Sequence, residues 1–351
     1  MGRFSLWFSL AALALFAVAA GVYVTLDAFN EFKPLQTGTF KGVCAPVTGV
    51  PGPEDVQIEM GRKRVFVSSF DRLTGGAGAR GAIYAFNIDD PLDASSWVDR
   101  TQGVPKKFEP HGVHLYADGA VTRLFVVNAA AKAIELYDVG ADGDLAHLET
   151  ITERRLTSPN DVVAVGPRAF YVTNDVQPGR GSLLGRLYFL LRAGSGSVLF
   201  YDGQSWRAAA DGLRYANGVA VSADGERVFV AESAASDLRV FRRDIATNAL
   251  ADAGVIVLDA SPDNINIDGD GALWIAAHPR PLSLGGFFAM KEGRSPSLVL
   301  RYSAADGGKP VALFADDGKQ LSASSAAARS GSTLVIGSLF DRKFLICQLP
   351  Q

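Results

Sequence analysis

The 351-residue sequence is poor in several residue types, and each shortage narrows the range of folds and functions. Two cysteines cannot build a disulfide framework, and four scattered histidines do not suggest a zinc site. Lys and Arg total 34 against 37 Asp and Glu, so no basic excess points to nucleic acid. The chain contains neither a Gly-x-Ser-x-Gly nucleophile turn nor an EF-hand loop. A hydrophobic content of 48% excludes a disordered chain.

One long uncharged segment stands at the N-terminus, from Phe4 to Leu26. A bilayer takes about 20 apolar residues to cross, so this segment is long enough. Arg3 precedes it, and the positive-inside tendency then places the following chain outside the cytoplasm. Residues 17–19 read Ala-Val-Ala, so a cleaved signal peptide is the alternative to a retained anchor. We expect a signal-anchor helix or signal peptide over residues 1–28, a linker over 29–43 and one exported domain over 44–351.

The remaining chain repeats one sequence pattern. In each repeat a short strand and a turn are followed by a second strand rich in β-branched and aromatic residues. Repeats of ~40–50 residues that hold several strands are typical of a β-propeller. A large β-sandwich also has many short strands, but a sandwich does not require the same strand-turn-strand pattern to occur six times. We therefore predict an all-β, six-bladed β-propeller preceded by a hydrophobic helix. The second strands start at Arg64, Arg123, Ala169, Arg227, Ala272 and Thr333.

Polar residues precede the first strand of each repeat. The innermost strand of every propeller blade lines the central channel, so residues at the start of these strands meet at one mouth. Adjacent residues on a strand point in opposite directions, so each pair offers one side chain near the mouth and one deeper. The pairs are Glu54-Asp55, His111-Gly112, Asn160-Asp161, Asn217-Gly218, Asp263-Asn264 and Ser324-Ser325.

Carboxylates and amide carbonyls are hard oxygen ligands, and 6–8 such oxygens are typical of a Ca²⁺ site. Two neighbouring calcium ions, one near the mouth and one deeper, would use both members of each pair. A single buried ion that braces the channel is the alternative.

These residues resemble the paraoxonase/arylesterase family in order and spacing from about residue 44 to 349. The longest matching run is 160–167, and shorter matches lie at 110–112, 216–218, 263–264 and 278–279. The resemblance implies a six-bladed propeller with two calcium ions that hydrolyses lactones and aryl esters, with organophosphates as side substrates. The implied ligands are Glu54, Asn160, Asn217, Asp263 and Asn264 for a catalytic calcium, and Asp55, Asp161 and the backbone carbonyl of Val113 for a structural calcium.

His111 is the first candidate for the general base that activates a water, because imidazole titrates near neutral pH. The family pattern pairs this residue with a second histidine, and Ala129 stands at that position here. Glu54 or Asp263 is the alternative base where a carboxylate oxygen is free. Ser324, Ser325 and His278 are expected to line the pocket, and four apolar loop residues are expected to contact the substrate: Phe70, Leu73, Phe287 and Phe288.

The amphipathic stretch 183–192 is interpreted as a lid, a membrane-contacting helix or an insertion packed on the rim. Two other functions remain open: a sugar lactonase of the gluconolactonase type, and a non-catalytic propeller that binds a partner on its face. Several charges at the axis disfavour a scaffold, because buried charges are costly unless an ion pairs them. The expected partners are a small ester or lactone and a membrane, with no nucleic acid.

The two cysteines flank the repeats, since Cys44 precedes the first and Cys347 ends the last predicted strand. A propeller closes its ring by joining its first and last blades, and the resemblance places the family's disulfide at these positions. Outside the cytoplasm such a bond persists. We predict one intramolecular disulfide, Cys44–Cys347.

Overall fold

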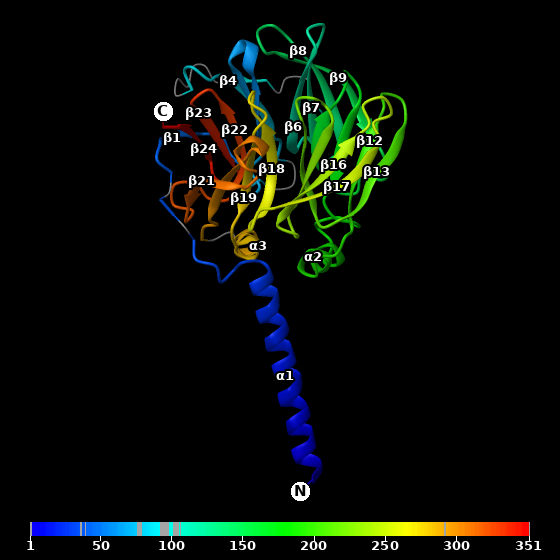
Figure 1. The fold of residues 1–351 in the computed structure, drawn as a ribbon, viewed down its shortest axis with the longest axis vertical. Coiled ribbons are helices and arrows are strands. Elements are labelled where there is room, and N and C mark those ends of the chain that lie inside the picture. The colour runs from blue at the N-terminus through cyan, green and yellow to red at the C-terminus, as the bar shows by residue number, and fades with distance from the viewer. Residues whose placement is uncertain are drawn as a thin grey trace.

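A computed structural model describes residues 2–35, 37–38, 40–75, 79–91, 98–100, 105, 107–290 and 293–350, without the side chains of 2–6, 287–289 and 306. Helix α1 (Gly2–Ala28) stands away from the remaining chain as one long rod (Figure 1). Its segment Trp7–Ala28 has a mean hydropathy of 2.1 and is not buried, and Tyr23 near its end stacks on Phe32 with ring centroids 5.3 Å apart. By length and composition this helix can cross a membrane.

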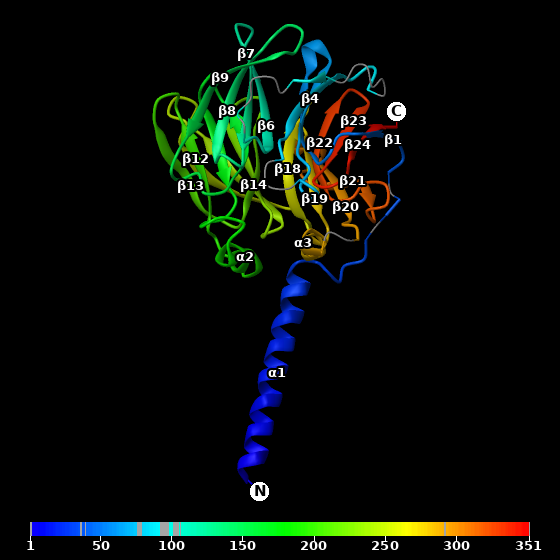
Figure 2. The same cartoon turned by 180° about the vertical axis from the view of Figure 1, so that it is seen from behind.

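Six four-stranded antiparallel sheets are arranged around a central axis, as predicted (Figures 1 and 2). Blade 1 holds β2 (Pro53–Glu59), β3 (Arg64–Ser69), β4 (Ala82–Asn87) and β5 (Val98–Asp99). Blade 2 holds β6 (Pro110–Ala117), β7 (Thr122–Asn128), β8 (Ala133–Val139) and β9 (Leu145–Thr152). Blade 3 holds β10 (Pro159–Ala164), β11 (Phe170–Asn174), β12 (Gly196–Tyr201) and β13 (Trp206–Leu213).

Blade 4 holds β14 (Ala216–Val221), β15 (Arg227–Glu232), β16 (Asp237–Arg243) and β17 (Leu250–Val257). Blade 5 holds β18 (Ser261–Ile267), β19 (Leu273–His278), β20 (Ser297–Tyr302) and β21 (Val311–Asp316). Blade 6 holds β22 (Ser324–Ser330), β23 (Thr333–Ser338), β24 (Lys343–Gln348) and, as its outer strand, β1 (Val43–Thr48). Two short helices, α2 (Leu183–Leu190) and α3 (Pro281–Met290), and two 3-10 turns, Met60–Arg62 and Ala304–Asp306, complete the described elements.

Apolar side chains between neighbouring blades form the core. Val56 and Val67 of blade 1, for example, pack with Val335 and Phe344 of blade 6. The alternation of β-branched and aromatic residues explains this arrangement, because both faces of each sheet are covered by the next blade. The innermost strands β2, β6, β10, β14, β18 and β22 each contact the next in the ring.

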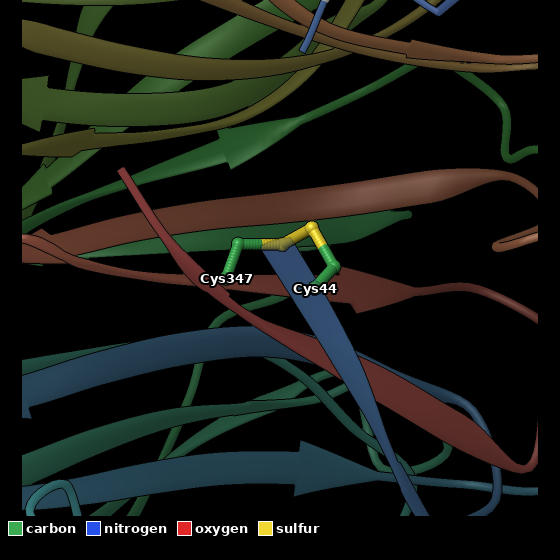
Figure 3. Close-up of a disulfide and its surroundings, with 2 residues drawn as sticks. All are labelled: Cys44 and Cys347. Atoms are coloured by element: carbon green, nitrogen blue, oxygen red, sulfur yellow. A yellow bond between two sulfur atoms is a disulfide. The ribbon is translucent and has the colours of Figure 1, made fainter. Parts of the chain in front are cut away.

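The ring closes in blade 6, where the chain's first strand pairs with its last. Strand β1 lies antiparallel to β24, and Cys44 faces Cys347 directly in the register. The two residues form a disulfide across a sequence separation of 303 residues, which confirms the predicted pairing (Figure 3).

Helices α2 and α3 lie at one end of the propeller, where each innermost strand begins and each second strand ends. Helix α1 leaves the domain at the same end (Figures 1 and 2), which we call the anchor end. Buried Phe29 stacks on Phe189 of α2, with ring centroids 5.1 Å apart. The Glu31 carboxylate accepts hydrogen bonds from the backbone N–H groups of Leu282 (2.7 Å) and Ser283 (3.2 Å) at the start of α3. Residues just after α1 thus contact both helices.

Candidate active site

Every innermost strand carries the same β-bulge near its start, at the anchor end. In each blade two residues are inserted between two ladder-paired positions, for example between Pro159 and Val162 of β10. A β-bulge interrupts the regular alternation of side chains between the two faces of a strand. The inserted residues therefore need not alternate, and both can face the channel. The inserted pairs are 54–55, 111–112, 160–161, 217–218, 263–264 and 325–326.

The sixth pair differs by one residue from the predicted Ser324-Ser325. Ser324 is ladder-paired with Ser338, and its hydroxyl bonds to the main chain of blade 5, accepting from Leu298 N at 3.1 Å. Ser325 occupies the inserted position, and its hydroxyl donates to the Glu54 carbonyl oxygen at 2.6 Å. Ser325 therefore lies at the site, whereas Ser324 joins two blades.

Residues predicted as ligands meet across the channel. Asn264 places Nδ2 3.3 Å from Oε1 of Glu54, and His111 places Nδ1 3.7 Å from the same oxygen. All of the predicted ligand side chains are buried. The structure therefore brings residues from blades 1, 2 and 5, which are far apart in sequence, to one mouth.

The carboxylates of this cluster are buried, and the nearby arginine side chains do not offset the cost of that burial. Burial, opposed by Arg72 and reinforced by Asp263, raises the pKa of Glu54 to about 7. Burial also raises the pKa of Asp55 and of Asp161 well above the usual range, and the charge of Asp161 adds to the effect on Asp55. Buried carboxylates that repel one another are stabilised when a cation lies between them.

Four buried oxygens at this mouth have no hydrogen-bond partner: Oε2 of Glu54 and the Oδ1 atoms of Asn160, Asn217 and Asn264. Buried polar atoms are nearly always paired, so a group of unpaired buried oxygens at one end of the channel suits a hard cation. Among the described residues, no three His, Cys, Asp or Glu side chains are grouped as ligands of one ion. The donors here are largely amides, which fits calcium better than zinc.

Asp55 and Asp161 lie deeper and link successive blades. Asp55 Oδ2 accepts from the backbone N–H of Val113 at 2.8 Å, and Asp161 Oδ2 accepts from that of Val219 at 2.7 Å. Gly112 makes this packing possible, because a Cβ at that position would lie 2.1 Å from Oδ1 of Asp161. Asp55, Asp161 and Val113, which the resemblance implies for a structural ion, thus lie next to one another.

On the second strand, one residue is ladder-paired with the position just before the inserted pair, and the residue after it supports the inserted residue of its own blade. Ser233 Oγ accepts from Asn217 Nδ2 at 3.1 Å, and His278 Nε2 lies 3.0 Å from Oδ2 of Asp263. The registers place Ala129 at the matching position of blade 2. His278 therefore contacts Asp263, and Ala129 offers His111 no equivalent side chain.

Two arginines that the sequence reasoning missed flank His111. Arg180 NH1 lies 3.5 Å from both ring nitrogens of His111, and its Nε lies 2.8 Å from Oδ2 of Asp175. Arg72 NH2 lies 3.9 Å from Oε2 of Glu54. Burial first, then Arg72 and Arg180, hold the pKa of His111 well below its usual range. Both arginines come from loops of unequal length, so the repeat gave no signal for them.

A cavity of about 420 Å³ opens near this cluster, and none of the predicted ligands lines it. Glu109, Ala129 and Arg180 line it, together with Lys132 and Ser158. Glu109 places Oε1 3.5 Å from Nε2 of His111, so two lining residues, Glu109 and Arg180, contact the candidate base, which does not itself line the cavity.

Two of the four predicted apolar contact residues can be placed. The guanidinium carbon of Arg72 lies over the Phe70 ring, 5.9 Å from the ring centroid. Leu73 packs against Ala323 and Phe340. The side chains of Phe287 and Phe288 lie outside the described residues.

Fold and site together define a class: a six-bladed β-propeller whose channel holds a buried centre of carboxylates and amides at one mouth. Solved structures share this fold. A gluconolactonase from Xanthomonas campestris superposes with a TM-score of 0.58 at 18% identity, covering 89% of this chain and 91% of that one. A calcium-binding protein, regucalcin, from Agrobacterium tumefaciens gives 0.54 at 14% identity, covering 86% and 90%. At these identities the likeness concerns the fold alone.

Sequence comparison narrows the class. The chain belongs to the arylesterase family, whose pattern matches residues 65–349. Serum paraoxonase/arylesterase 1 is 30% identical to it in both Rattus norvegicus and Homo sapiens, over 96% of each chain. Serum paraoxonase/lactonase 3 of Oryctolagus cuniculus is 28% identical over 93% of each chain. The chain is therefore a hydrolase of the paraoxonase/arylesterase family, which confirms the resemblance stated above.

Proposed function

We propose that the protein is a calcium-dependent hydrolase of aryl esters and lactones. The observation that carries this proposal is the set of four buried oxygens without a hydrogen-bond partner at one mouth, from Glu54, Asn160, Asn217 and Asn264. The names of the relatives, which include arylesterase and lactonase, supply the substrate class.

The donor set divides into two layers, and we assign one ion to each. Glu54, Asn160, Asn217, Asp263 and Asn264 would hold a catalytic calcium, and Asp55, Asp161 and the carbonyl of Val113 a structural one. When bound at the mouth, calcium supplies a Lewis acid that polarises the ester carbonyl and favours the developing oxyanion. Asp55 and Asp161 keep the inner strands in register through their bonds to Val113 and Val219.

We assign His111 the role of general base. Its ring is buried and neutral at pH 7, because burial and two guanidiniums disfavour the imidazolium. A neutral imidazole can accept a proton from a water in the mouth. Its Nε2 faces Glu109 on the cavity wall, while its Nδ1 faces Glu54. Glu54 remains the alternative base, since its pKa of about 7 suits proton exchange near neutral pH.

His278 and Ser233 act as positioning residues in this proposal. His278 holds one oxygen of Asp263, and Ser233 holds the amide nitrogen of Asn217, which leaves the other atom of each group turned toward the mouth. The chain thereby fixes two donors before any ligand binds, and preorganised donors lose little free energy to reorganisation.

We further propose that α1 anchors the domain in a membrane, with the propeller outside the cytoplasm. The apolar helix and the Cys44–Cys347 disulfide suggest the secretory pathway. Leu183 and Leu191 at the ends of α2 are exposed at the anchor end, where they would touch the bilayer surface.

Turnover assays with and without a chelator test the proposed function. Phenyl acetate, a γ-lactone and gluconolactone serve as substrates for aryl-ester, lactone and sugar-lactone activity. Turnover of the first two that chelator abolishes and calcium restores is the expected result. Asn217→Ala and Asp263→Ala should lose activity, and Asn248→Ala, on a distant hairpin, is the control. Failure to hydrolyse any of the three at saturating calcium would contradict the proposal.

A further inference from the structure

Blade 3 carries a carboxylate at the position from which blades 4 and 5 support their inserted residues. Asn174 is ladder-paired with Pro159, just before the inserted pair of β10, and Asp175 follows Asn174. Ser233 and His278 hold the same position in blades 4 and 5. Asp175 is completely buried, so its charge needs a partner within the protein.

Arg180 is that partner, and its guanidinium is held at several points. Its Nε lies 2.8 Å from Oδ2 of Asp175, and its NH2 group donates to the carbonyl oxygen of Pro159 at 2.8 Å. The Ser158 hydroxyl oxygen accepts from the same Nε at 3.1 Å. Burial raises the pKa of Asp175, and the Arg180 guanidinium opposes this rise more strongly than any other group. A planar guanidinium bound to a carboxylate and a carbonyl at once has a fixed orientation.

The third nitrogen of this guanidinium, NH1, lies against the ring of His111 in blade 2. It is 3.5 Å from Nδ1 and 3.5 Å from Nε2. A donor bonded to one ring nitrogen lies near the ring plane beyond that nitrogen, and it is farther from the other nitrogen. Equal distances therefore place NH1 over the face of the ring, where a guanidinium packs favourably on an aromatic system. Arg180 thus limits the tilt of the His111 ring without occupying either nitrogen.

The carboxylates near His111 do not hold the ring as closely. The nearest carboxylate oxygens that the structure describes belong to Glu109, 3.5 Å from Nε2, and Glu54, 3.7 Å from Nδ1. Hydrogen bonds from a ring nitrogen are about 2.7–3.2 Å long, so both distances are too great. Ala129, at the supporting position of blade 2, contributes only a methyl group.

We propose that Arg180 is the positioning residue of His111. Asp175 occupies the supporting position of blade 3, and through Arg180 it acts on the inserted residue of blade 2, which Ala129 does not support. The proposal deepens the proposed function and rests on it, because the tilt of the ring affects turnover only if His111 accepts the proton.

Nuclear magnetic resonance line widths of the His111 ring test its position. The chain has four histidines, so a ¹³C label at Cε1 gives four signals from the full chain in an uncharged detergent with calcium. The spectrum of His111→Gln identifies the signal of His111. We expect this signal to broaden in Arg180→Met, because the ring then samples several orientations. Arg180→Lys should broaden it as well, since an ammonium keeps the charge beside Asp175 but lacks the planar fork.

Kinetics on phenyl acetate supply a second readout. In both variants kcat should fall about 10- to 100-fold while KM stays within about twofold, because a misplaced base slows the chemical step without weakening substrate binding. Arg180→Met leaves a buried carboxylate without a partner, which is strongly destabilising. Arg180→Lys keeps a cation opposite Asp175 and so preserves the fold, which an unchanged thermal midpoint verifies.

Arg329→Met is the matched control. Arg329 also lies 2.8 Å from a buried carboxylate, that of Asp268, and its exposed fraction is 25% against 33% for Arg180. It lies near the end of β22, far along the strand from the inserted pair, so its loss should change neither the His111 signal nor kcat.

A sharp His111 signal in Arg180→Lys, or an unchanged kcat in that variant of an active enzyme, would overturn the proposal. Equal broadening in Arg329→Met would also overturn it, because any lost ion pair would then have the same effect. A wild-type protein that hydrolyses no substrate would contradict the proposed function instead, and the His111 signal would still report whether Arg180 holds the ring.

Discussion

His278 Nε2 lies 3.0 Å from Oδ2 of Asp263, whereas Ala129, at the matching position of blade 2, offers His111 no side-chain partner. In blades 4 and 5 a side chain of the second strand contacts the first residue of the inserted pair. In blade 2 the matching side chain is the methyl group of Ala129, so His111 has no such contact. Arg180 and Glu109 contact the His111 ring instead, each at 3.5 Å. The candidate base thus lies among charged neighbours, and two of them, Glu109 and Arg180, line a nearby cavity.

Replacing His111 tests its assignment. His111→Gln keeps a polar side chain of similar reach but removes the proton acceptor, so kcat should fall about 10²-fold or more, as for loss of a general base. The measurement is kcat/KM for phenyl acetate as a function of pH. The decrease of kcat/KM at low pH that His111 protonation causes in the wild type should be absent in the variant.

His147→Gln is the matched control, because His147 lies on the outermost strand of the same blade, β9, and does not contact His111. Wild-type turnover in His111→Gln would move the role of base to Glu54. Ala129→His is the complementary variant, and it should raise kcat if an imidazole beside His111 aids proton transfer.

Chelation should destabilise the protein more at pH 8 than at pH 5. The pKa of Glu54 is raised from 4.5 to about 7 without a cation, so its protonated form stabilises the fold below about pH 4.5. This contribution is lost as the pH rises through about 7. Calcium replaces the proton, so the gain in thermal midpoint on adding Ca²⁺ should increase across that interval. Scanning calorimetry with EDTA or excess Ca²⁺ measures it.

Glu54→Gln removes the titration while keeping an oxygen donor. Its calcium-induced change in midpoint should be smaller at pH 8 and should depend less on pH than that of the wild type, with the remaining dependence coming from Asp55 and Asp161. A calcium response that is flat with pH in the wild type would show that Glu54 does not exchange a proton for the ion.

The fold could be predicted from sequence because the information is local and repeated. A turn such as Asp224-Gly225 between two apolar runs specifies a hairpin, and six copies specify a ring. The candidate ligands recur at the same position of each repeat. Asn160 and Asn217, for example, are each the first residue of the inserted pair, in β10 and β14. The sixth pair was misplaced by one residue, because Ala326 is apolar and gives no sign of its position.

The charged surroundings of His111 could not be predicted in the same way. Arg72 and Arg180 belong to loops whose lengths do not repeat, and only folding brings them to the mouth. The packing of Phe29 on Phe189 likewise joins a predicted linker to a predicted insertion, two segments without a shared pattern. Contacts between such segments depend on the three-dimensional path of the chain.

Removing the disulfide should weaken the fold without changing the site. C44S/C347S opens a loop of sequence separation 303, and loss of a native disulfide typically costs ~2–5 kcal/mol of unfolding free energy. Urea unfolding measures the loss, while kcat at 25 °C should remain within twofold of wild type because both cysteines lie on the outer strands of blade 6. Two alkylatable thiols in the unreduced wild type would contradict the disulfide itself.

His114 should make the protein sensitive to acid. Burial lowers its pKa from 6.5 to about 4, and its Nδ1 accepts a hydrogen bond from the backbone N–H of Ala164 at 3.2 Å. The unfolded chain therefore binds a proton between pH 6.5 and 4 that the folded chain does not. Stability from this residue is complete above pH 6.5 and is lost as the pH falls toward 4, by roughly 3 kcal/mol. His114→Asn keeps an acceptor for Ala164 but cannot titrate, so its unfolding free energy should decline less steeply over this interval in urea titrations. Parallel declines in the two proteins would show that His114 is protonated in the folded state, since titrations of all other groups cancel in the difference.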